Sequence, residues 1–298
     1  MTLDQYAFVD PTTRYPVISP PEQRTDEPGL ESEIEPRPDL GESSYRGSHR
    51  LDGRKALVTG ADSGIGAAVA IAFAREGADV ALSYLPEEQS DAERIAELVR
   101  DAGRVALLLP GDIREAGHCR DLVASTVEGL GGIDILVSNA GKQVFQESIE
   151  DISEEQFDDT MKTNVYALFR LVKAALPHLP AGSTIISTAS QEAYLPAPDL
   201  LDYAATKGAI NVFSKALAQQ LAPRGIRVNI VAPGPTWTAL QPSGGQSPDK
   251  LPEFGQNSPL GRSGQPAELA PAYVFLASGE SSYVVGSTLV VNGGKPTP

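Results

Sequence analysis

The sequence predicts an α/β protein: one doubly wound domain with a mostly parallel seven-stranded sheet, preceded by an extended N-terminal arm. Two observations predict this fold. Short apolar runs alternate with longer segments of helical spacing from Arg54 onward, and a glycine-rich turn joins the first apolar run to the first helix. Parallel strands need crossover connections, which the intervening helices supply. A chain of 298 residues is long enough to bury a substantial core.

The first 50 residues differ in composition from the rest of the chain. Prolines alternate there with acidic side chains, a composition that buries little surface and disfavours helix and sheet. The same segment contains an apolar group, namely Tyr6, Phe8, Val9, Tyr15, Val17 and Ile18. Two alternatives therefore stay open, a free tail or an arm that docks on its own core or on a neighbouring subunit. We divide the chain into an arm, residues 1–50, and a folded domain, residues 51–298.

Seven apolar runs are predicted to be strands, because most are continuous and have the length of strands buried on both faces. They are residues 55–59, 79–84, 105–109, 134–137, 183–187, 227–231 and 287–291. Helical spacing appears between them. One set of apolar residues runs from Ala92 to Val99 and stops before Gly103, and another runs from Phe157 to Val172.

Charge and cysteine usage exclude several classes of partner. Thirty-nine acidic and twenty-four basic residues give a net charge of −15 and a pI near 4.6, which repels nucleic acids and anionic membranes. Cys119 is the single cysteine, so no intramolecular disulfide can form. The histidines, His49, His118 and His178, are scattered and predict no metal site. Because no apolar run is long enough to span a bilayer and no targeting segment follows Met1, we expect a cytoplasmic protein.

A glycine-rich turn directly follows the first predicted strand. The segment Thr59-Gly60-Ala61-Asp62-Ser63-Gly64-Ile65-Gly66 lies between the apolar run 56–58 and the helix-like run 67–73. Glycines at this position permit a tight turn and let a pyrophosphate approach backbone N–H groups at the positive end of the helix. The order of strand, turn and helix indicates a Rossmann-type dinucleotide site rather than a simple loop.

A tyrosine and a lysine share one face of a later predicted helix. Tyr203 and Lys207 are four residues apart, and Ser190 lies thirteen residues upstream of Tyr203. A free tyrosine ionises near pH ~10, so it is a poor base at neutral pH unless a positive charge favours the phenolate. We expect Lys207 to supply that charge, which would let Tyr203 exchange a proton with a substrate oxygen. Combined with a dinucleotide site, this pair predicts a dehydrogenase.

Several segments, in order along residues 50–294, resemble the short-chain dehydrogenase/reductase family. The glycine turn has the spacing Gly-x-x-x-Gly-x-Gly preceded by Thr, and Asn139-Ala140-Gly141 follows the fourth predicted strand. Asp112 follows the third strand, Asn164 falls in the fourth helix, and Pro233-Gly234 with Thr238 follows the sixth strand. The acidic arm and the segments 28–33, 83–85 and 233–238 resemble a bacterial subgroup called glucose/ribitol dehydrogenase-like or general-stress oxidoreductases.

The resemblance implies an NAD(P)-dependent oxidoreductase that transfers a hydride between nicotinamide and a small carbonyl or alcohol substrate, with Tyr203 as general acid or base. It assigns Ser190 to the substrate oxygen, Lys207 to the nicotinamide ribose and Asn164 to a proton-relay water. It assigns to the cofactor Gly60, Asp62, Ser63, Gly64, Ile65, Gly66, Tyr84, Leu85, Asp112, Ile113, Asn139, Ala140, Gly141, Tyr203, Lys207, Pro233, Gly234, Thr236 and Thr238. It also implies a homotetramer.

The choice between NAD and NADP depends on the end of the second predicted strand. Tyr84 and Leu85 stand there, without the acidic residue typical of NAD-preferring members or the arginine typical of NADP-preferring ones. Ser63 also stands where many NADP-preferring members carry a basic residue. Nearby acidic side chains would disfavour a 2′-phosphate; they are Asp62, Glu87 and Glu88. We expect NAD, with NADP as the alternative.

Substrate selection is expected in the loop 235–266, which is rich in Pro, Gly and Ser and can act as a lid. Side chains expected to face the substrate are Gln143, Gln191, Glu192, Tyr194 and Trp237. Their polarity favours a small polar aldehyde, a ketone or a sugar-like alcohol. One alternative is a catalytically silent dinucleotide-binding sensor or scaffold, against which the intact Ser190, Tyr203 and Lys207 argue. Epimerisation and enoyl reduction are disfavoured by the glycine spacing and the Tyr-x-x-x-Lys pattern.

Overall fold

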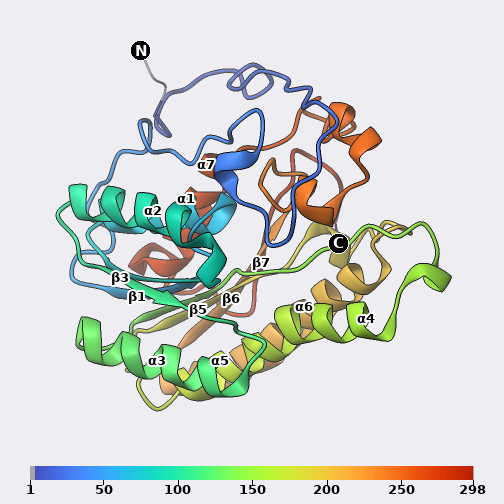
Figure 1. Cartoon of the computed structure of the whole chain (residues 1–298). Coiled ribbons are helices and arrows are strands. Elements are labelled where there is room, and N and C mark those ends of the chain that lie inside the picture. Colours follow the sequence, from blue (N-terminus) through green and yellow to red (C-terminus); the bar gives the residue numbers. More distant parts are fainter. Residues whose placement is uncertain (1–3, 298) are drawn as a thin grey trace.

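The structure, a computed structural model, describes residues 4–297 and contains a seven-stranded sheet (Figure 1). The strands are β1 (Lys55–Thr59), β2 (Asp79–Tyr84), β3 (Ala106–Pro110), β4 (Ile135–Ser138), β5 (Thr184–Thr188), β6 (Arg227–Pro233) and β7 (Thr288–Val291). They lie in the order β3-β2-β1-β4-β5-β6-β7, and all neighbouring pairs are parallel. The predicted doubly wound fold is confirmed, and its sheet is parallel throughout.

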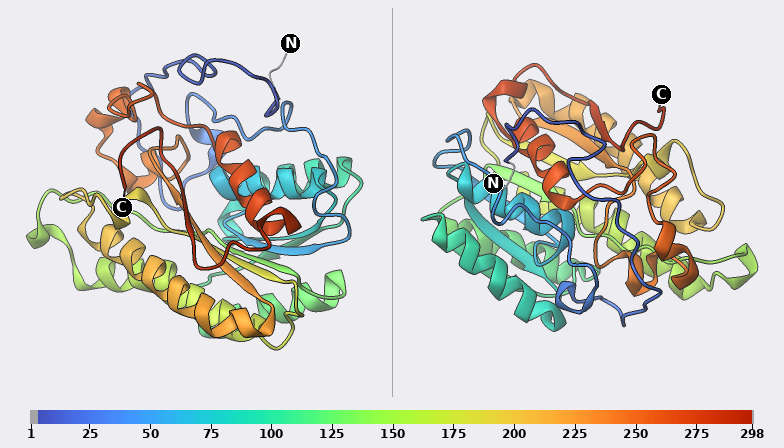
Figure 2. Two further views of the ribbon diagram at one scale, coloured as in Figure 1. Left: turned by 180° about the vertical axis from the view of Figure 1, so that it is seen from behind. Right: turned by 90° about the horizontal axis from the view of Figure 1, so that it is seen from above.

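Two layers of helices cover the sheet (Figures 1 and 2). The helices α1 (Gly64–Arg75), α2 (Gln89–Asp101) and α7 (Pro266–Ala277) lie on one face, and α3 (Ala116–Leu130), α5 (Ala167–Ala175) and α6 (Leu201–Leu221) lie on the other. Each layer has its own apolar core, with Phe73 and Tyr273 fully buried in the first and Leu122 and Leu171 in the second. Strands covered on both faces explain the continuous apolar runs in the sequence.

The strand order places a crevice between two functional segments. From β1 the chain runs outward to β2 and β3, then returns to β4 on the other side of β1. Connections that diverge in this way leave space at the carboxyl ends of the strands, where ligands of such folds bind. The glycine turn follows β1 and the Asn139-Ala140-Gly141 segment follows β4. The topology therefore brings both predicted cofactor segments to one crevice.

The helix predicted over 157–172 is interrupted. α4 (Glu154–Met161) leads into a π-helix, Lys162–Tyr166, and only then into α5. Asn164 lies in this π segment and is buried. Short π segments add a residue to a turn and are frequent at functional sites, so the interruption changes the direction in which Asn164 points.

The arm lies against the folded domain in the described residues 4–50, and Figures 1 and 2 show it passing over the layer that contains α1 and α7. Its regular structure there is a 3-10 helix, Glu31–Glu33. Leu40 and Tyr45 of the arm are buried in the same core as α1 and α7. The sequence left open a free tail or a docked arm, and in the structure the arm is docked on its own core.

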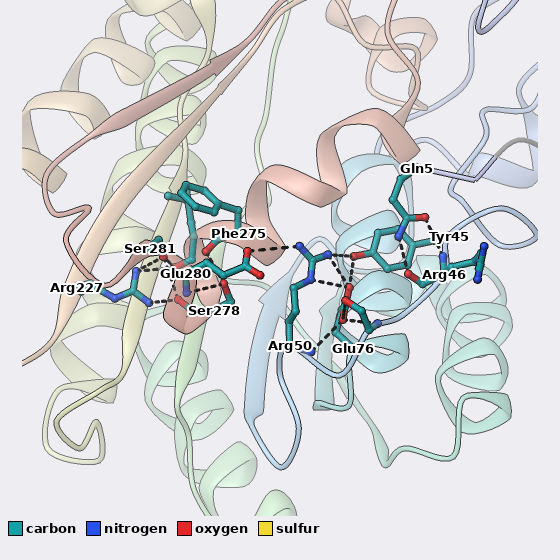
Figure 3. A network of polar contacts seen from close by, with 12 residues as sticks. Gln5, Tyr45, Arg46, Arg50, Glu76, Arg227, Phe275, Ser278, Glu280 and Ser281 are labelled. Atoms are coloured by element: carbon teal, nitrogen blue, oxygen red, sulfur yellow. Dashed lines mark hydrogen bonds and ion pairs between the residues drawn. The ribbon is translucent and has the colours of Figure 1, made fainter. Parts of the chain in front are cut away.

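A buried carboxylate just after α1 fixes the end of the arm (Figure 3). Glu76 is fully buried and accepts hydrogen bonds from the Tyr45 hydroxyl at 2.7 Å and from Arg50 Nη2 at 2.6 Å. The Ser48 backbone N–H donates to the same carboxylate at 2.8 Å. Burial acts to raise the pKa of Glu76, but the bonds from Arg50 and Tyr45 outweigh it and hold the pKa at about 2.

Candidate active site

A cavity of about 690 Å³ opens at the carboxyl ends of the central strands. This volume is within the range of small-molecule and cofactor pockets. The predicted site residues that line it are Gly60, Asp62, Ser63, Gly64, Ile65, Tyr84, Leu85, Asp112, Ile113, Asn139, Ala140, Gly141, Gln143, Ser190, Gln191, Glu192, Tyr203, Lys207, Pro233, Gly234, Thr236 and Thr238. The predicted residues outside its wall are Gly66, Asn164, Tyr194 and Trp237.

The glycine turn leaves no room for larger residues. Gly60 and Gly64 have φ values of +62° and +49°, in the left-handed region that favours glycine. A Cβ on Gly66 would lie 1.8 Å from the Gly60 carbonyl oxygen. The turn thus presents bare backbone at the N-terminus of α1 on the wall of a large cavity. These features fit the pyrophosphate of a dinucleotide.

Asp62, in the glycine turn, carries a buried carboxylate on the part of the cavity wall that also contains Tyr84 at the end of β2. Its side chain is 1% exposed, and Oδ2 has no hydrogen-bond partner among the described residues. Burial raises the pKa of Asp62 to about 6, and burial together with the charge of Asp62 raises that of Glu88 to about 8. A buried acceptor without a partner is uncommon in folded proteins, and it fits a ligand that donates from a hydroxyl, such as a ribose.

Asn139 ties β4 to the neighbouring strands. Its Nδ2 donates to the carbonyl oxygens of Thr59 at 3.2 Å and Gly60 at 3.3 Å, and its backbone N–H donates to Thr59 Oγ1 at 3.0 Å. The Thr188 hydroxyl, at the end of β5, donates to Asn139 Oδ1 at 3.3 Å. Asn139 therefore holds the start of the glycine turn in place.

Tyr203 and Lys207 lie one turn apart on α6, and both are buried. Lys207 Nζ is 5.2 Å from the centroid of the Tyr203 ring and donates to the Thr188 carbonyl oxygen at 2.9 Å. Burial lowers the pKa of Lys207 to about 8. Burial raises the pKa of Tyr203 above its usual value, and a hydrogen bond with Ser190 offsets only part of this effect. Burial therefore dominates and keeps the phenol protonated, and the expectation that Lys207 favours the phenolate stays a prediction.

Three hydroxyl groups follow one another near the end of β5, and they have different partners. Ser187 Oγ accepts from Ser214 at 2.9 Å, and the Thr188 hydroxyl bonds to Tyr273 at 2.7 Å. Ser190 Oγ accepts from the Glu192 backbone N–H at 3.1 Å and, like Thr188 and Tyr203, Ser190 lines the cavity. The Thr188 hydroxyl already has two partners, Asn139 and Tyr273, so the Ser190 hydroxyl, which the thirteen-residue spacing selects, stays the predicted partner of a substrate oxygen.

Asn164 fixes the segment after β4 against α6. Its Oδ1 accepts from the Lys142 backbone N–H at 2.8 Å, and its Nδ2 donates to the Lys142 carbonyl oxygen at 2.9 Å. Nδ2 also donates to Thr206 Oγ1 at 2.9 Å. All of these bonds are to the protein, so the assignment of Asn164 to a relay water stays a prediction.

Trp237 is placed differently from what the sequence led us to expect. It is fully buried, its Nε1 donates to the Pro36 carbonyl oxygen at 2.6 Å, and its ring packs against Phe254 with centroids 6.1 Å apart. Trp237 therefore anchors the arm to the lid instead of facing a substrate. Tyr194, the other predicted substrate residue outside the cavity wall, is partly buried.

The arm, the lid and the segment after β4 contribute further wall residues; those of the lid lie in the loop predicted to select the substrate, whereas those of the arm and Lys142 were missed. They include Glu27, Pro28, Lys142, Leu240, Gln241, Gln246 and Phe254. Glu27 forms an ion pair with Lys142, and the Gln143 amide donates to the Gly245 carbonyl oxygen at 2.6 Å. No local pattern marks Glu27, because its partner is 115 residues away. Lys142 directly follows the Asn139-Ala140-Gly141 motif, and this position was an available signal.

Comparison with known proteins identifies the family. The family described as "Enoyl-(Acyl carrier protein) reductase" matches residues 60–295, from the glycine turn to beyond β7. A crystal structure of a short chain dehydrogenase from Burkholderia cenocepacia in complex with NADP is 36% identical, with a TM-score of 0.75 over 82% of this chain and 98% of that chain. This chain belongs to the short-chain dehydrogenase/reductase family. The family predicted from the motifs is confirmed, and the chain is an NAD(P)-dependent oxidoreductase.

Two curated relatives match almost the whole chain. The "Uncharacterized oxidoreductase YghA" of Escherichia coli is 56% identical over 96% of this chain and 97% of its own length. The "Glucose and ribitol dehydrogenase" of Daucus carota is 43% identical over 92% of this chain and 96% of its own length. Both matches extend into the arm, because the domain 51–298 makes up less than 92% of the chain. They support the glucose/ribitol dehydrogenase-like subgroup of the family.

Two further findings concern residues 4–297. Within them, no three or more His, Cys, Asp or Glu side chains are grouped so that they could hold a metal ion. None of the helices in that range combines the length and the apolar character needed to cross a membrane.

Proposed function

We propose that this enzyme transfers a hydride between NAD and a small uncharged carbonyl or alcohol substrate, with Tyr203 as general acid or base. The observation that carries the proposal is the buried Tyr203 on the cavity wall, which it shares with Ser190, with Lys207 Nζ 5.2 Å from the centroid of its ring. A nicotinamide cofactor, when bound, supplies or accepts the hydride. The protein side chains then have to bind the substrate oxygen and move one proton.

In carbonyl reduction, Tyr203 Oη donates its proton to the substrate oxygen as the carbonyl carbon receives the hydride. Ser190 Oγ donates a hydrogen bond to the same oxygen, which holds it within reach of Tyr203. The Lys207 ammonium stabilises the phenolate that remains until Tyr203 regains a proton from solvent. In alcohol oxidation the same atoms act in reverse, and Tyr203 accepts the hydroxyl proton. Because burial keeps the phenol protonated, Tyr203 is in the form that carbonyl reduction requires.

The preference for NAD rests on charge. Asp62 and the exposed Glu87 bring carboxylates to the cavity wall near the end of β2, and Arg94 of α2 and Arg114 of the cavity wall already have acidic partners. Arg94 lies 2.5 Å from a glutamate oxygen, and Arg114 lies 2.8 Å from an aspartate oxygen. A 2′-phosphate carries a charge of about −2, which these carboxyl groups would repel. The relative from Burkholderia cenocepacia is a complex with NADP, so we infer that the two proteins differ in cofactor preference.

An uncharged polar substrate fits the rest of the cavity wall. Glutamine side chains line it, and the Oε1 atoms of Gln191 and Gln241 are buried without a partner among the described residues. Such acceptors suit substrate hydroxyl groups. Lys142 is already paired with Glu27 and is not available to an anionic substrate. The carrot relative is named for glucose and ribitol, which agrees with a sugar, a polyol or a short hydroxyaldehyde here.

The test is turnover by Tyr203→Phe, with the exposed Tyr283→Phe as the matched control. General acid or base catalysis contributes about 10²- to 10⁴-fold, so kcat/KM should fall by about that factor in Tyr203→Phe. NADH affinity should be retained in both variants. Short aldehydes, ketones, polyols and an enoyl thioester should be assayed with NADH, NADPH and their oxidised forms. Unchanged turnover in Tyr203→Phe would exclude the mechanism.

The alternative is a catalytically silent sensor or scaffold that binds a dinucleotide. Binding of NADH by the wild-type protein without turnover of any substrate in the panel would favour it. Reduction of the enoyl thioester alone would instead favour an enoyl reductase. The intact set of Ser190, Tyr203 and Lys207 argues for the carbonyl and alcohol chemistry.

We also propose a cytoplasmic homotetramer. The outer face of the layer that contains α5 and α6 exposes large apolar side chains, with Phe169 50% exposed and Val212 68% exposed. Light scattering should give four times the chain mass of 31.4 kDa, and Phe169→Glu with Val212→Glu should reduce it. A reducing compartment agrees with the single, buried Cys119 and would be tested by cell fractionation.

A further inference from the structure

We propose that the N-terminal arm is a functional part of the cofactor site and that Glu31 is a positioning residue for the glycine turn. The inference rests on the proposed dinucleotide site and adds a residue from outside the folded domain. It assigns to the arm a role in cofactor affinity, in addition to its contacts with the core.

Glu31 joins three parts of the protein. Its side chain comes from the arm and is almost fully buried, at 2% exposure. Oε2 accepts a hydrogen bond from the Gly64 backbone N–H at 2.7 Å, and Oε1 accepts from Arg94 Nη2 at 2.5 Å. The Glu31 backbone N–H donates to Asp91 Oδ2 at 2.7 Å. Arg94 and Asp91 are both on α2, so Glu31 fixes the start of α1 relative to α2.

Gly64 is confined from two sides. Glu31 holds its N–H from the side of the arm, while a Cβ at Gly64 would lie 2.8 Å from Thr238 Cγ2 of the lid. Its φ of +49° is a conformation that glycine adopts without strain and that a hydrogen bond can stabilise. Gly64 and Ile65 line the cavity, so a shift of Gly64 moves the backbone that would meet the pyrophosphate. Loss of the Glu31 bond should therefore weaken cofactor binding.

The stretch of the arm around Glu31 also contacts other segments of the cavity wall. The Thr25 backbone N–H donates to the Pro242 carbonyl oxygen at 3.2 Å, and Glu27 pairs with Lys142. Pro36 accepts from Trp237 Nε1 at 2.6 Å. Residues 25–36 therefore bridge the glycine turn, the segment after β4 and the lid. Coupling between two equilibria is reciprocal, so a docked arm should favour the bound cofactor, and the cofactor should favour the docked arm.

The test compares Glu31→Gln and Glu31→Ala with Glu33→Gln, which removes an exposed carboxylate from the same 3-10 helix. Fluorescence titration with NADH measures affinity. Trypsin cleavage after the exposed Arg24, with and without NADH, measures arm release. We expect the Glu31 variants to raise the NADH dissociation constant by about fivefold or more, with kcat at saturating NADH retained and Glu33→Gln like wild type. NADH should slow cleavage in the wild type and less so in Glu31→Ala.

The outcomes separate this inference from the proposed function. Wild-type protein that binds neither NADH nor NADPH would refute the dinucleotide site itself. Wild-type binding with unchanged affinity in both Glu31 variants would overturn the inference alone. A lower melting temperature in the Glu31 variants, with NADH affinity and NADH protection of the arm unchanged, would also overturn it, because Glu31 would then be a structural brace.

Discussion

Replacing Asp62 with asparagine removes one negative charge from the cofactor site while keeping the shape of the side chain. In the structure Asp62 is buried, and its Oδ2 has no partner among residues 4–297. A hydrogen bond to a charged acceptor contributes ~1.5–3 kcal/mol, and asparagine keeps a neutral acceptor. We therefore expect the dissociation constant for NADH to rise about tenfold, the lower end of that range.

The same substitution should tighten the binding of NADPH. Two unit charges at roughly 5 Å interact by ~3 kcal/mol at an effective dielectric constant of about 20, and Asp62→Asn removes that repulsion. Since NADPH binding tightens by about 10²-fold while NADH binding weakens about tenfold, the ratio of the NADPH to the NADH dissociation constant should fall by about three orders of magnitude. Since the pKa of Asp62 is about 6 and that of Glu88 is about 8, wild-type discrimination against NADPH should also weaken as the pH falls from 8.5 to 6.

Fluorescence titrations of wild type, Asp62→Asn and Glu87→Gln with both reduced cofactors measure these effects. Glu87 is exposed and lines the same cavity, so Glu87→Gln removes an equal charge without removing a buried acceptor. We expect a much smaller change in that control. A wild-type preference for NADPH, or an unchanged NADPH to NADH ratio in Asp62→Asn, would refute the reasoning.

Two further substitutions test the arm. Glu27→Gln should free Lys142 and raise kcat/KM for glyceraldehyde 3-phosphate relative to glyceraldehyde by about fivefold, and an unchanged ratio would contradict the substrate proposal. Glu76→Gln should lower the free energy of unfolding at pH 7 by about 3 kcal/mol in urea titrations, because the pKa of Glu76 is lowered from 4.5 to about 2. The difference should shrink as the pH falls from 4.5 towards 2, and equal urea midpoints at pH 7 would exclude this role.

The sheet could be predicted from the sequence because its central strands are buried on both faces. A continuous apolar run such as that of β1 contrasts with its neighbours, and its bounds agree with the prediction. β3, β4 and β5 begin and end one residue later than predicted. The π segment around Asn164 was missed because apolar residues recur at helical spacing through it, from Phe157 to Val172. The spacing of apolar residues alone does not reveal that one helical turn contains an extra residue.

The candidate site could be predicted where its chemistry is local. Tyr203 and Lys207 are four residues apart on one helix, and glycines 60 and 64 belong to one turn, so short patterns in the sequence mark them. Trp237 was misassigned because an indole in a loop gives no indication of its partner. That partner, the carbonyl of Pro36, is 201 residues away. Glu27 and Glu31 escaped prediction for the same reason, since an acidic arm has the composition of a free tail.

The acidic side chains of the cavity wall affect the selectivity of ligand binding more than they affect the rate of the reaction. The carboxyl and basic side chains that line it are those of the acidic Glu27, Asp62, Glu87, Glu88, Asp112 and Glu192 and of the basic Arg114, Lys142 and Lys207. In the proposed carbonyl reduction, a positive charge on the nicotinamide ring and a negative charge on Tyr203 would form together. A negative field stabilises the first and destabilises the second, so its net effect on the step is small. The same negative field repels a 2′-phosphate or an anionic substrate, and no opposing effect cancels this repulsion. Glu27 of the arm contributes to the field.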